Sequence, residues 1–425
     1  MQIVTAGAPE AAAALAALAA RAEAESAEVC GTVSRIIASV RERGWDACRE
    51  FSLRYDGALP REVSREEIAA ALAACDPALR RALERAAGNI YDHQKRLVPR
   101  EGRWLTPDGG EAGFAARPLQ RVGIYVPGGL AAYPSSVLMT AVCAKAAGVG
   151  EVVMVTPPTE HLSGAVLAAA AIAGVGRVFA IGGAQAVAAL ALGAGDIEKA
   201  DFIAGPGNAY VSEAKRQLYG VVNIDSLAGP SEILIIADGT ANAAWVAADL
   251  LAQAEHGRRA RALLLTVSAE LAAGVALETE KQAALLPRGA AALRELTDGG
   301  LIILCESLEQ ACDEANAAAA EHVEIITQNP RELLGRIRHA GAVFLGAYSP
   351  EALGDYMAGP SHVLPTGGSA RRFSPLSADS FTRKMSVIEY GREHLRSAQK
   401  DIEAIARAEG LDAHAASVTA RFERL

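Results

Sequence analysis

The sequence predicts an α/β protein whose parallel sheets are covered by helices on both faces. Between about residues 121 and 356, short apolar runs alternate with longer Ala- and Leu-rich stretches. The apolar runs are continuous rather than alternating, which is typical of strands buried on both faces. The chain has 425 residues, too many for one ordinary core, so more than one such unit is expected.

The alternating stretch divides near Gly229 and Pro230 into two α/β units. The expected strands are 122–127, 151–157, 177–183 and 201–207 before the division, and 232–238, 262–268, 301–305, 323–327 and 342–346 after it. The helices expected between them include 135–149, 184–195 and 242–257. Segments 24–100 and 377–425 are charged and are expected to be mostly helical, with packing on a partner chain as one role open to them.

Composition excludes several classes of protein. Hydrophobic residues make up 51% and charged residues 21%, as in globular proteins, and a net charge of −9 without a long Lys/Arg run argues against nucleic acid. Six scattered cysteines without a Cys-x-x-Cys pair indicate reduced thiols. No apolar run approaches the ~20 residues that cross a bilayer. The Ala/Leu stretch after Pro9 lacks a basic opening and runs into Arg21, so it predicts an amphipathic helix rather than an export signal. We expect a cytoplasmic protein that binds neither nucleic acid nor membrane.

Three glycine-rich turns follow expected strands and could hold a dinucleotide. They are Tyr125–Gly129, Ile181–Gln185 and Ala204–Tyr210. In open α/β sheets, ligands bind at the carboxyl ends of strands, where helix N-termini offer free amides to phosphates. Asn208 is well placed as a helix N-cap. None of the turns has the G-x-G-x-x-G pattern, so each alone is also compatible with an ordinary tight turn, whereas three in one half of the chain favour a nucleotide.

Several of the eight histidines stand near other side chains that bind metals. The candidate pairs are Gln253 with His256, Asp355 with His362, and Glu409 with His414. Residues three apart, as in the first pair, share one face of a helix. Nitrogen and oxygen donors without cysteine suit zinc or another divalent first-row ion. Capping of a helix end or exposure to solvent would also explain these residues, and periodicity cannot bring distant pairs together.

A further candidate is the pair Glu321 and His322 in the stretch AEHVEII. Adjacent residues of a regular helix or strand point in different directions, but at a bend between a helix and a strand both can line one pocket. Histidine has a pKa suited to a general base, and a carboxylate beside it can align a water molecule. The alternative is a polar corner in which His322 caps the preceding helix and Glu321 is solvated.

Long motifs occur in order over nearly the whole chain; they include RVGIYVPGGLAAYPSSVLMTAV, DFIAGPGNAYVSEAK, IDSLAGPSEILIIAD, DLLAQAEHG, EHVEI, GDYMAGPSHVLPT and AEGLDAHAASV. Together these motifs resemble those of histidinol dehydrogenases. The resemblance implies two incomplete Rossmann-like parallel-sheet domains plus small helical terminal segments that interlock a homodimer. The implied domains are an N-terminal helical segment (1–22), a first Rossmann-like domain (23–124 and 232–376), a second, NAD-contacting domain (125–231) and a C-terminal dimerisation segment (377–425).

The resemblance also implies an activity and a set of site residues. The activity is the zinc-dependent oxidation of L-histidinol by NAD, through L-histidinal to L-histidine, in histidine biosynthesis. The implied residues are the catalytic pair Glu321 and His322; the NAD contacts Tyr125, Gln185 and Asn208; the zinc (Zn2+) ligands Gln253, His256, Asp355 and, from the partner subunit, His414; and the substrate contacts Ser231 and Glu409, with His322 and the zinc ligands also contacting substrate. His362 is expected in the same pocket.

Two departures from the family pattern leave the substrate open. Ser361 stands where relatives usually carry Asn, and the stretch after VLPTGG differs. The alternative within the class is a zinc-dependent dehydrogenase of another small polar alcohol. A zinc hydrolase and a non-catalytic nucleotide-binding scaffold are the alternatives from other classes. The AEGLDAH motif favours histidinol.

Overall fold

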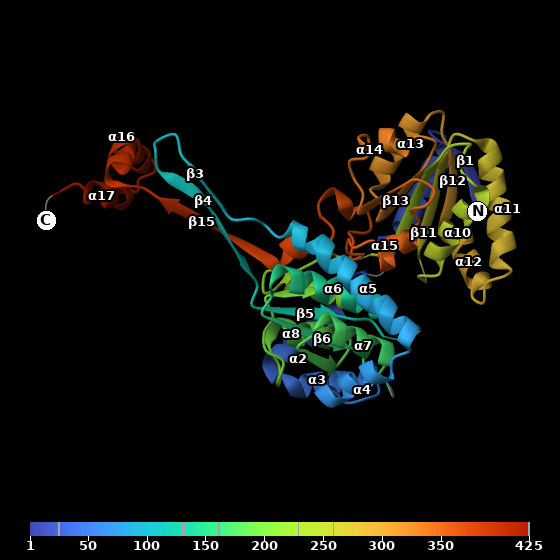
Figure 1. The fold of residues 1–425 in the computed structure, drawn as a ribbon, viewed down its shortest axis with the longest axis horizontal. Coiled ribbons are helices and arrows are strands. Elements are labelled where there is room, and N and C mark those ends of the chain that lie inside the picture. Colours follow the sequence, from blue (N-terminus) through green and yellow to red (C-terminus); the bar gives the residue numbers. More distant parts are fainter. Residues whose placement is uncertain (24–25, 129–131, 160–161, 228, 258, 424–425) are drawn as a thin grey trace. The chain divides into compact units, whose positions relative to one another are not determined.

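The computed structural model describes residues 1–423 apart from 24–25, 129–131, 160–161, 228 and 258. The chain forms two compact units (Figure 1). The first unit comprises Met1–Leu97 and Leu119–Phe381, and the second comprises Val98–Pro118 and Thr382–Leu425. Within the described residues, the first unit contains two six-stranded sheets and the second a three-stranded sheet. The predicted α/β class with parallel sheets is confirmed.

The first sheet has the strand order β1-β12-β11-β10-β13-β14, and all neighbouring strands are parallel. Its strands are β1 (Gln2–Thr5), β10 (Glu232–Ala237), β11 (Arg261–Thr266), β12 (Gly300–Leu304), β13 (His322–Ile326) and β14 (Ala342–Leu345). In the central strand β10, Ile233 and Ile235 pack on one face of the sheet, whereas Leu234 and Ile236 pack on the other. The continuous apolar run therefore produces a strand buried on both faces.

Helices cover both faces of the first sheet. They are α10 (Ala243–Ala254), α11 (Ala269–Ala283) and α12 (Gly289–Gly299) on one face and α1 (Pro9–Glu23) and α13 (Leu308–Ala318) on the other, with short helices α14 (Pro330–Leu334) and α15 (Glu351–Tyr356) after β13 and β14. Asn242 caps α10 by accepting from the Ala244 N–H at 2.9 Å. Ser307 caps α13 by accepting from the Gln310 N–H at 3.2 Å. Each such cap stabilises a helix by about 1 kcal/mol, and these two fix the helices that lead to the site.

The second sheet has the strand order β2-β7-β6-β5-β8-β9. Its strands are β2 (Arg61–Val63), β5 (Arg121–Tyr125), β6 (Glu151–Thr156), β7 (Arg177–Ala180), β8 (Phe202–Ala204) and β9 (Asn223–Ile224). The strands are parallel except β2, which is antiparallel to β7. Every strand predicted from the sequence is present in one of the two large sheets: those before Gly229 belong to the second sheet and those after it to the first.

Two helical layers accompany the second sheet. One layer contains α2 (Ser26–Arg43), α3 (Trp45–Tyr55), α8 (Gly183–Leu192) and α9 (Ala209–Leu218); the other contains α4 (Arg65–Ala74), α5 (Pro77–Gln94), α6 (Pro134–Ala147) and α7 (Gly164–Ala173). Short 3-10 helices occur at Lys95–Leu97, Ser369–Arg371 and Ala378–Phe381.

The grouping of the N-terminal segments differs from the prediction. Residues 23–124 were expected to join 232–376, but α2 packs on α8 and α9, and β2 pairs with the second sheet. Conversely, β1, within the predicted helical segment 1–22, pairs with β12 of the first sheet. Helical periodicity identifies the apolar face of a helix but not the sheet that will cover it, so the sequence pattern did not decide this grouping.

The second unit combines a small antiparallel sheet with two helices. Its elements are β3 (Gly102–Leu105), β4 (Glu111–Pro118), β15 (Thr382–Glu389), α16 (Arg392–Ala408) and α17 (Asp412–Thr419). The expectation of a mostly helical 377–425 is correct for α16 and α17 but wrong for β15. Exposed large apolar side chains in this unit include Trp104, Leu105, Met385, Ile388, Ile405 and Leu411.

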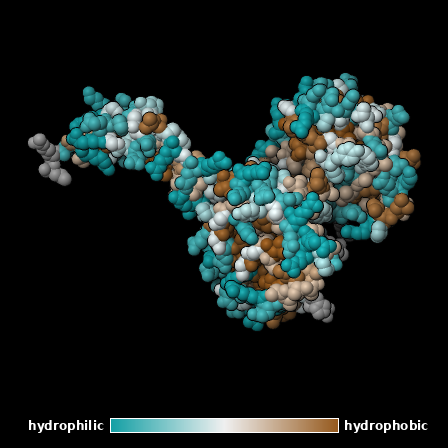
Figure 2. Space-filling view, in the orientation of Figure 1, coloured by the Kyte–Doolittle hydropathy of each residue, from teal (hydrophilic) through white to brown (hydrophobic). Residues whose placement is uncertain are grey.

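The N-terminal helix, the cysteines and the surface are the remaining general features of the chain. The predicted N-terminal helix is present and begins at Pro9. Among the described residues, no helix is both long and apolar enough to span a bilayer. All six cysteines are free thiols, as the sequence indicated. Hydrophilic and hydrophobic side chains are interspersed over the visible face of each unit (Figure 2).

A buried ion pair holds the turn after β8. The side chains of Lys215 and Asp225 are 1% and 3% exposed and form a direct ion pair. Lys215 Nζ also donates to Gly205 O at 3.0 Å, and the Gly205 N–H donates to Asp225 Oδ2 at 2.8 Å. Gly205 has φ +116°, and a Cβ there would lie 2.1 Å from Tyr125 O, so only glycine fits. The ion pair therefore holds the backbone of the turn at a position that only glycine can occupy.

We expect Lys215→Met to lower the free energy of unfolding by about 3–5 kcal/mol, because it leaves the Asp225 charge buried and unpaired. Urea unfolding followed by far-UV circular dichroism measures the change. Lys281→Met is the matched control: Lys281 is 68% exposed in its pair with Glu278, so its loss should cost at most ~1 kcal/mol. Equal effects of the two substitutions would contradict a structural role for the buried pair.

Candidate active site

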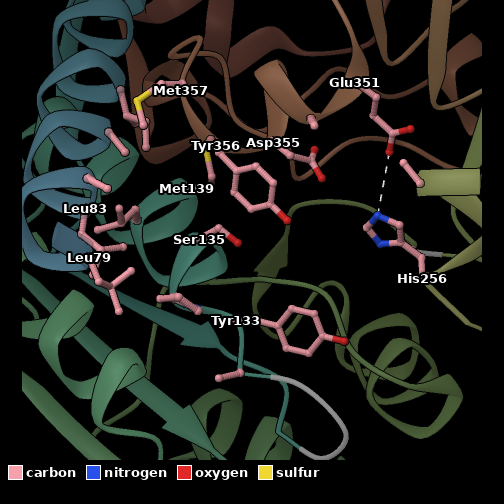
Figure 3. Close-up of a pocket in the computed structure, with 18 of the residues that line it drawn as sticks. Leu79, Leu83, Tyr133, Ser135, Met139, His256, Glu351, Asp355, Tyr356 and Met357 are labelled. Atoms are coloured by element: carbon pink, nitrogen blue, oxygen red, sulfur yellow. Dashed lines mark ion pairs between the residues drawn. The ribbon is translucent and has the colours of Figure 1, made fainter. Parts of the chain in front are cut away.

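A cavity of about 550 Å³ in the first unit brings together several of the predicted site residues. Its apolar wall comes from α5 and α6, with Leu83 and Met139 among the lining residues, and its polar wall comes from the end of α10 and from α15 (Figure 3). The polar wall includes His256, Glu351 and Asp355. A volume of this size accommodates a small metabolite.

Glu321 and His322 lie where the sequence placed them, between a helix and a strand. Helix α13 ends at Ala318, and β13 begins at His322. Glu321 is 6% and His322 4% exposed, so neither is solvated. The polar-corner interpretation, with Glu321 in water and His322 capping a helix, is therefore wrong.

The backbone of one residue of the neighbouring strand, Glu232, contacts both members of this pair. The Glu232 N–H donates to Glu321 Oε2 at 2.9 Å, and His322 Nδ1 lies 3.0 Å from Glu232 O. A carbonyl oxygen only accepts, so Nδ1 carries the proton and Nε2 of the neutral ring holds the free lone pair. Nε2 is buried without a hydrogen-bond partner among the described residues. The site thus presents a proton-accepting nitrogen at a fixed position.

Burial sets the protonation of both groups. It lowers the pKa of His322 to about 3, so the imidazole is neutral near pH 7. Burial raises the pKa of Glu321 well above its ordinary value, against the hydrogen bond from the Glu232 N–H. Glu321 Oε2 is 3.8 Å from His322 Nδ1. A neutral imidazole beside a carboxyl group of raised pKa is a combination suited to acid–base catalysis.

Three of the polar side chains of the cavity form a group able to hold a metal ion. One ligand atom from each of His256, Glu351 and Asp355 lies within 4.8 Å of the others. Asp355 Oδ1 is 3.9 Å from His322 Nε2, so this group adjoins the Glu321–His322 pair. Burial raises the pKa of Asp355 to about 6 and lowers that of His256, two changes that favour the uncharged forms in the metal-free protein. Imidazole and carboxylate donors fit zinc.

Gln253 lies behind this group and is fully buried. With its amide nitrogen directed at Glu351, it donates to both carboxylate oxygens at 3.0 Å; the opposite orientation would set the amide oxygen against that carboxylate. The predicted Gln253, His256 and Asp355 are therefore brought together, and Glu351 is a site residue that the sequence reasoning missed. Glu351 lies four residues before Asp355 and therefore on the same face of α15. This spacing could have identified Glu351 from the sequence.

The loop after α15 places His362 in the same site, as expected. His362 Nδ1 is 3.8 Å from Asp355 Oδ1, and Nε2 is 3.5 Å from Ser136 Oγ. Ser361, the departure from the family pattern, is buried and donates to Met139 O at 2.9 Å. Ser361 supports the loop through this bond, and its hydroxyl also accepts from the Val363 N–H.

The structure leaves three predicted residues outside this group. Ser231 is half-buried immediately before β10, next to Glu232. Glu409 and His414 belong to the second unit, where Glu409 follows α16, His414 lies in α17, and both are exposed. Their roles remain predictions.

The predicted cofactor residues all lie in or beside the glycine-rich turns of the second sheet. Tyr125 ends β5, and its hydroxyl accepts from the Gly183 N–H at 3.1 Å. Gln185 Nε2 donates to Asp56 Oδ2 at 3.2 Å. Asn208 is the N-cap of α9, as predicted, and accepts from the next helical N–H groups at 3.1 Å. Gly129 of the first turn lies outside the described residues. These side chains surround the carboxyl ends of the central strands, where nucleotides bind in open α/β sheets.

A further buried carboxyl group, Glu324, lies on the same strand as His322. Glu324 is two residues beyond His322 on β13 and is fully buried, and Oε1 accepts from the Glu351 N–H at 2.7 Å. Burial, reinforced by the carboxyl of Asp249, raises the pKa of Glu324 to about 9. Asp249 lies one helical turn before Gln253 on α10, so the same two elements carry the site and the carboxyl groups behind it.

This carboxyl group should make stability depend on pH. An unfolded glutamate releases its proton near pH 4.3, whereas folded Glu324 keeps it to about pH 9. The folded state therefore binds more protons in this window, and stability falls as pH rises through it. Glu324→Gln does not titrate, so its stability relative to wild type should grow from pH 5 to pH 9. Thermal unfolding of chelator-treated protein measures this, and curves that stay parallel would contradict it.

Comparison with known proteins identifies the family. Residues 19–422 match the histidinol dehydrogenase family model. Histidinol dehydrogenase of Heliobacterium mobile is 50% identical over 409 residues, which cover 94% of this chain and 95% of that protein. The Moorella thermoacetica enzyme is 51% identical over 403 residues, covering 93% of this chain and 95% of that protein. A crystal structure of histidinol dehydrogenase from Elizabethkingia anophelis aligns with a TM-score of 0.90 at 36% identity, covering 94% and 93% of the two chains. The chain therefore belongs to the histidinol dehydrogenase family, NAD-dependent oxidoreductases of histidine biosynthesis.

Proposed function

We propose that the cavity beside His322 is where L-histidinol is oxidised in two NAD-dependent steps, through L-histidinal to L-histidine. The observation that carries the proposal is the buried, unpartnered Nε2 of a neutral His322, 3.9 Å from a carboxylate of a group able to hold a metal. His322 Nε2 can serve as the base that a dehydrogenase needs, because hydride leaves an alcohol carbon only as the hydroxyl proton is taken up.

In the first step, His322 Nε2 accepts the hydroxyl proton while the hydride passes to NAD, giving the aldehyde and reduced cofactor. Glu321 then accepts a proton from a water molecule that adds to the aldehyde carbon. After His322 and Glu321 have released these protons to solvent, the hydrate would lose hydride to a second NAD and a proton to His322 in the second step, giving the carboxylic acid. Two adjacent residues held by the backbone of Glu232 can thus act in turn on one carbon atom of the substrate.

We further propose that Gln253, His256 and Asp355, with His414 of the partner subunit, would hold one zinc ion. Zinc would bind the imidazole and amino nitrogens of the substrate and so orient its alcohol carbon. Holding reactants in place in this way can lower a barrier by roughly 7–11 kcal/mol in favourable cases. Ser231 and the partner's Glu409 would contact the substrate, which requires a homodimer. The exposed apolar side chains of the second unit, such as Ile388 and Ile405, are consistent with a subunit interface.

NAD is proposed to bind at the second sheet, against Tyr125, Gln185 and Asn208. The hydrogen bonds of Tyr125 to Gly183 and of Gln185 to Asp56 keep these side chains in defined positions. We also propose the cytoplasm as the site of action, where six free thiols would stay reduced.

Turnover of L-histidinol with NAD, followed by the absorbance of reduced nicotinamide with and without a zinc chelator, tests the proposal. We expect two reduced cofactors per L-histidine formed, and loss of turnover on chelation that added zinc reverses. Turnover of another small polar alcohol but not of L-histidinol would instead support the alternative dehydrogenase. Zinc-dependent hydrolysis without cofactor reduction would contradict both.

A further inference from the structure

We propose that Glu351 is a positioning residue that orients the amide of Gln253, so that the amide oxygen faces the metal position. The inference rests on the proposed zinc site and adds to it a residue outside the implied set of ligands. An amide binds a metal through its oxygen and not through its nitrogen. The orientation of the Gln253 amide therefore decides whether its oxygen is available to the metal.

The contacts between the two side chains support this role. Gln253 is fully buried, and one terminal atom of its amide lies 3.0 Å from both oxygens of Glu351; with the amide nitrogen assigned to that position, Gln253 donates to both oxygens. When Glu351 is ionised, the reverse orientation would set the amide oxygen against two acceptor oxygens at the same distance, without a hydrogen bond. The carboxylate therefore discriminates between two orientations that are nearly identical in shape.

Glu351 is the most buried of the three polar side chains that line this wall of the cavity. The Glu351 side chain is 4% exposed, whereas His256 is 40% and Asp355 12% exposed. Glu351 Oε1 lies 3.9 Å from His256 Nε2 and 3.6 Å from His322 Nδ1. Figure 3 shows Glu351 and His256 facing each other across the polar side of the cavity, with Asp355 one helical turn away. Glu351 is thus next to the proposed ligands, with both oxygens already engaged by Gln253.

The backbone of Glu351 is itself fixed. Its N–H donates to Glu324 Oε1 at 2.7 Å, and Glu324 shares β13 with His322. The first turn of α15 is therefore tied to the strand that carries the catalytic histidine, while the Glu351 carboxylate is tied to α10 through Gln253. Groups that orient metal ligands through hydrogen bonds usually change metal affinity about 10- to 100-fold when they are replaced.

Glu351→Gln tests the inference, because it keeps the shape and one acceptor oxygen but no longer excludes the wrong amide orientation. The measurement is the zinc dissociation constant of metal-free protein, by competition with a chromogenic chelator. We expect a rise of about 10- to 100-fold, with one zinc per chain still bound at saturation and kcat at saturating zinc within a few-fold of wild type. Glu309→Gln, an exposed carboxylate of α13 that does not line the cavity, is the control and should leave the constant unchanged.

An exchange of the two residues separates orientation from direct ligation. Gln253→Glu alone sets two carboxylates against each other and should weaken zinc binding. Adding Glu351→Gln restores one donor and one carboxylate in exchanged positions, so the double variant should bind zinc at least about tenfold more tightly than Gln253→Glu. Additive losses in the double variant, or a loss in Glu351→Gln as complete as in Asp355→Asn, would overturn the positioning role. Unchanged affinity in Glu351→Gln would also overturn it while leaving the proposed function intact, whereas absence of zinc binding by the wild type would overturn both.

Discussion

Replacing His322 with asparagine is expected to lower kcat for L-histidinol oxidation by about 10²–10⁴-fold, the range that a general base contributes. His322 Nε2 is the buried lone pair without a partner among the described residues, and Asn offers no equivalent base. The rate of cofactor reduction at saturating L-histidinol and NAD measures the loss. His394→Asn, an exposed histidine in the second unit, is the control and should retain activity.

Glu321→Gln should impair the second oxidation, of L-histidinal, and largely spare the first, of L-histidinol. The amide keeps an acceptor for the Glu232 N–H but cannot take a proton from water. Oxidation of L-histidinol to the aldehyde should therefore persist, while oxidation of supplied L-histidinal should fall sharply. Equal losses in both half-reactions would show that Glu321 does not act specifically on the aldehyde.

Mixed dimers are expected to regain activity when one parent lacks His322 and the other lacks His414. If the tail of each subunit completes the site of its partner, each mixed dimer has one intact site. A statistical mixture of two inactive parents should then reach about a quarter of wild-type activity. Co-refolding or subunit exchange, followed by the turnover assay, measures this recovery.

The control for this experiment combines two lesions in the first unit. A mixture of His322→Asn with Asp355→Asn leaves each site with one lesion, because both residues come from the same subunit in every site. This mixture should stay inactive. If it regained activity like the first mixture, or if the first mixture stayed inactive, sites completed by the partner's tail would be excluded.

The large sheets were predictable because their strands are continuous apolar runs such as Ile233–Ala237, buried on both faces. The strands missed were of another kind. β1 is mostly exposed, β2 has only three residues, and β15 is exposed along most of its length. Such strands bury too little apolar surface to leave a pattern in the sequence, and partners far along the chain determine that they form.

The candidate site was predictable in part. The change from helical to strand periodicity between α13 and β13 predicts a bend at Glu321 and His322. The burial of these two residues depends on the neighbouring strand, which the local sequence pattern does not show. The pair also lies at the amino end of β13, whereas the rule for open α/β sheets directs attention to the carboxyl ends. Glu351 was missed because a carboxylate at the start of a short helix is usually exposed to solvent.

The most direct test of the proposed zinc site is a crystal structure of the zinc-loaded, assembled protein, with the metal located by its anomalous scattering. We predict one zinc per subunit within about 2.0–2.2 Å of Gln253, His256, Asp355 and His414 of the partner subunit. Zinc bound at other side chains, or a tail histidine remote from the other three ligands in the dimer, would contradict a shared site beside Glu321 and His322.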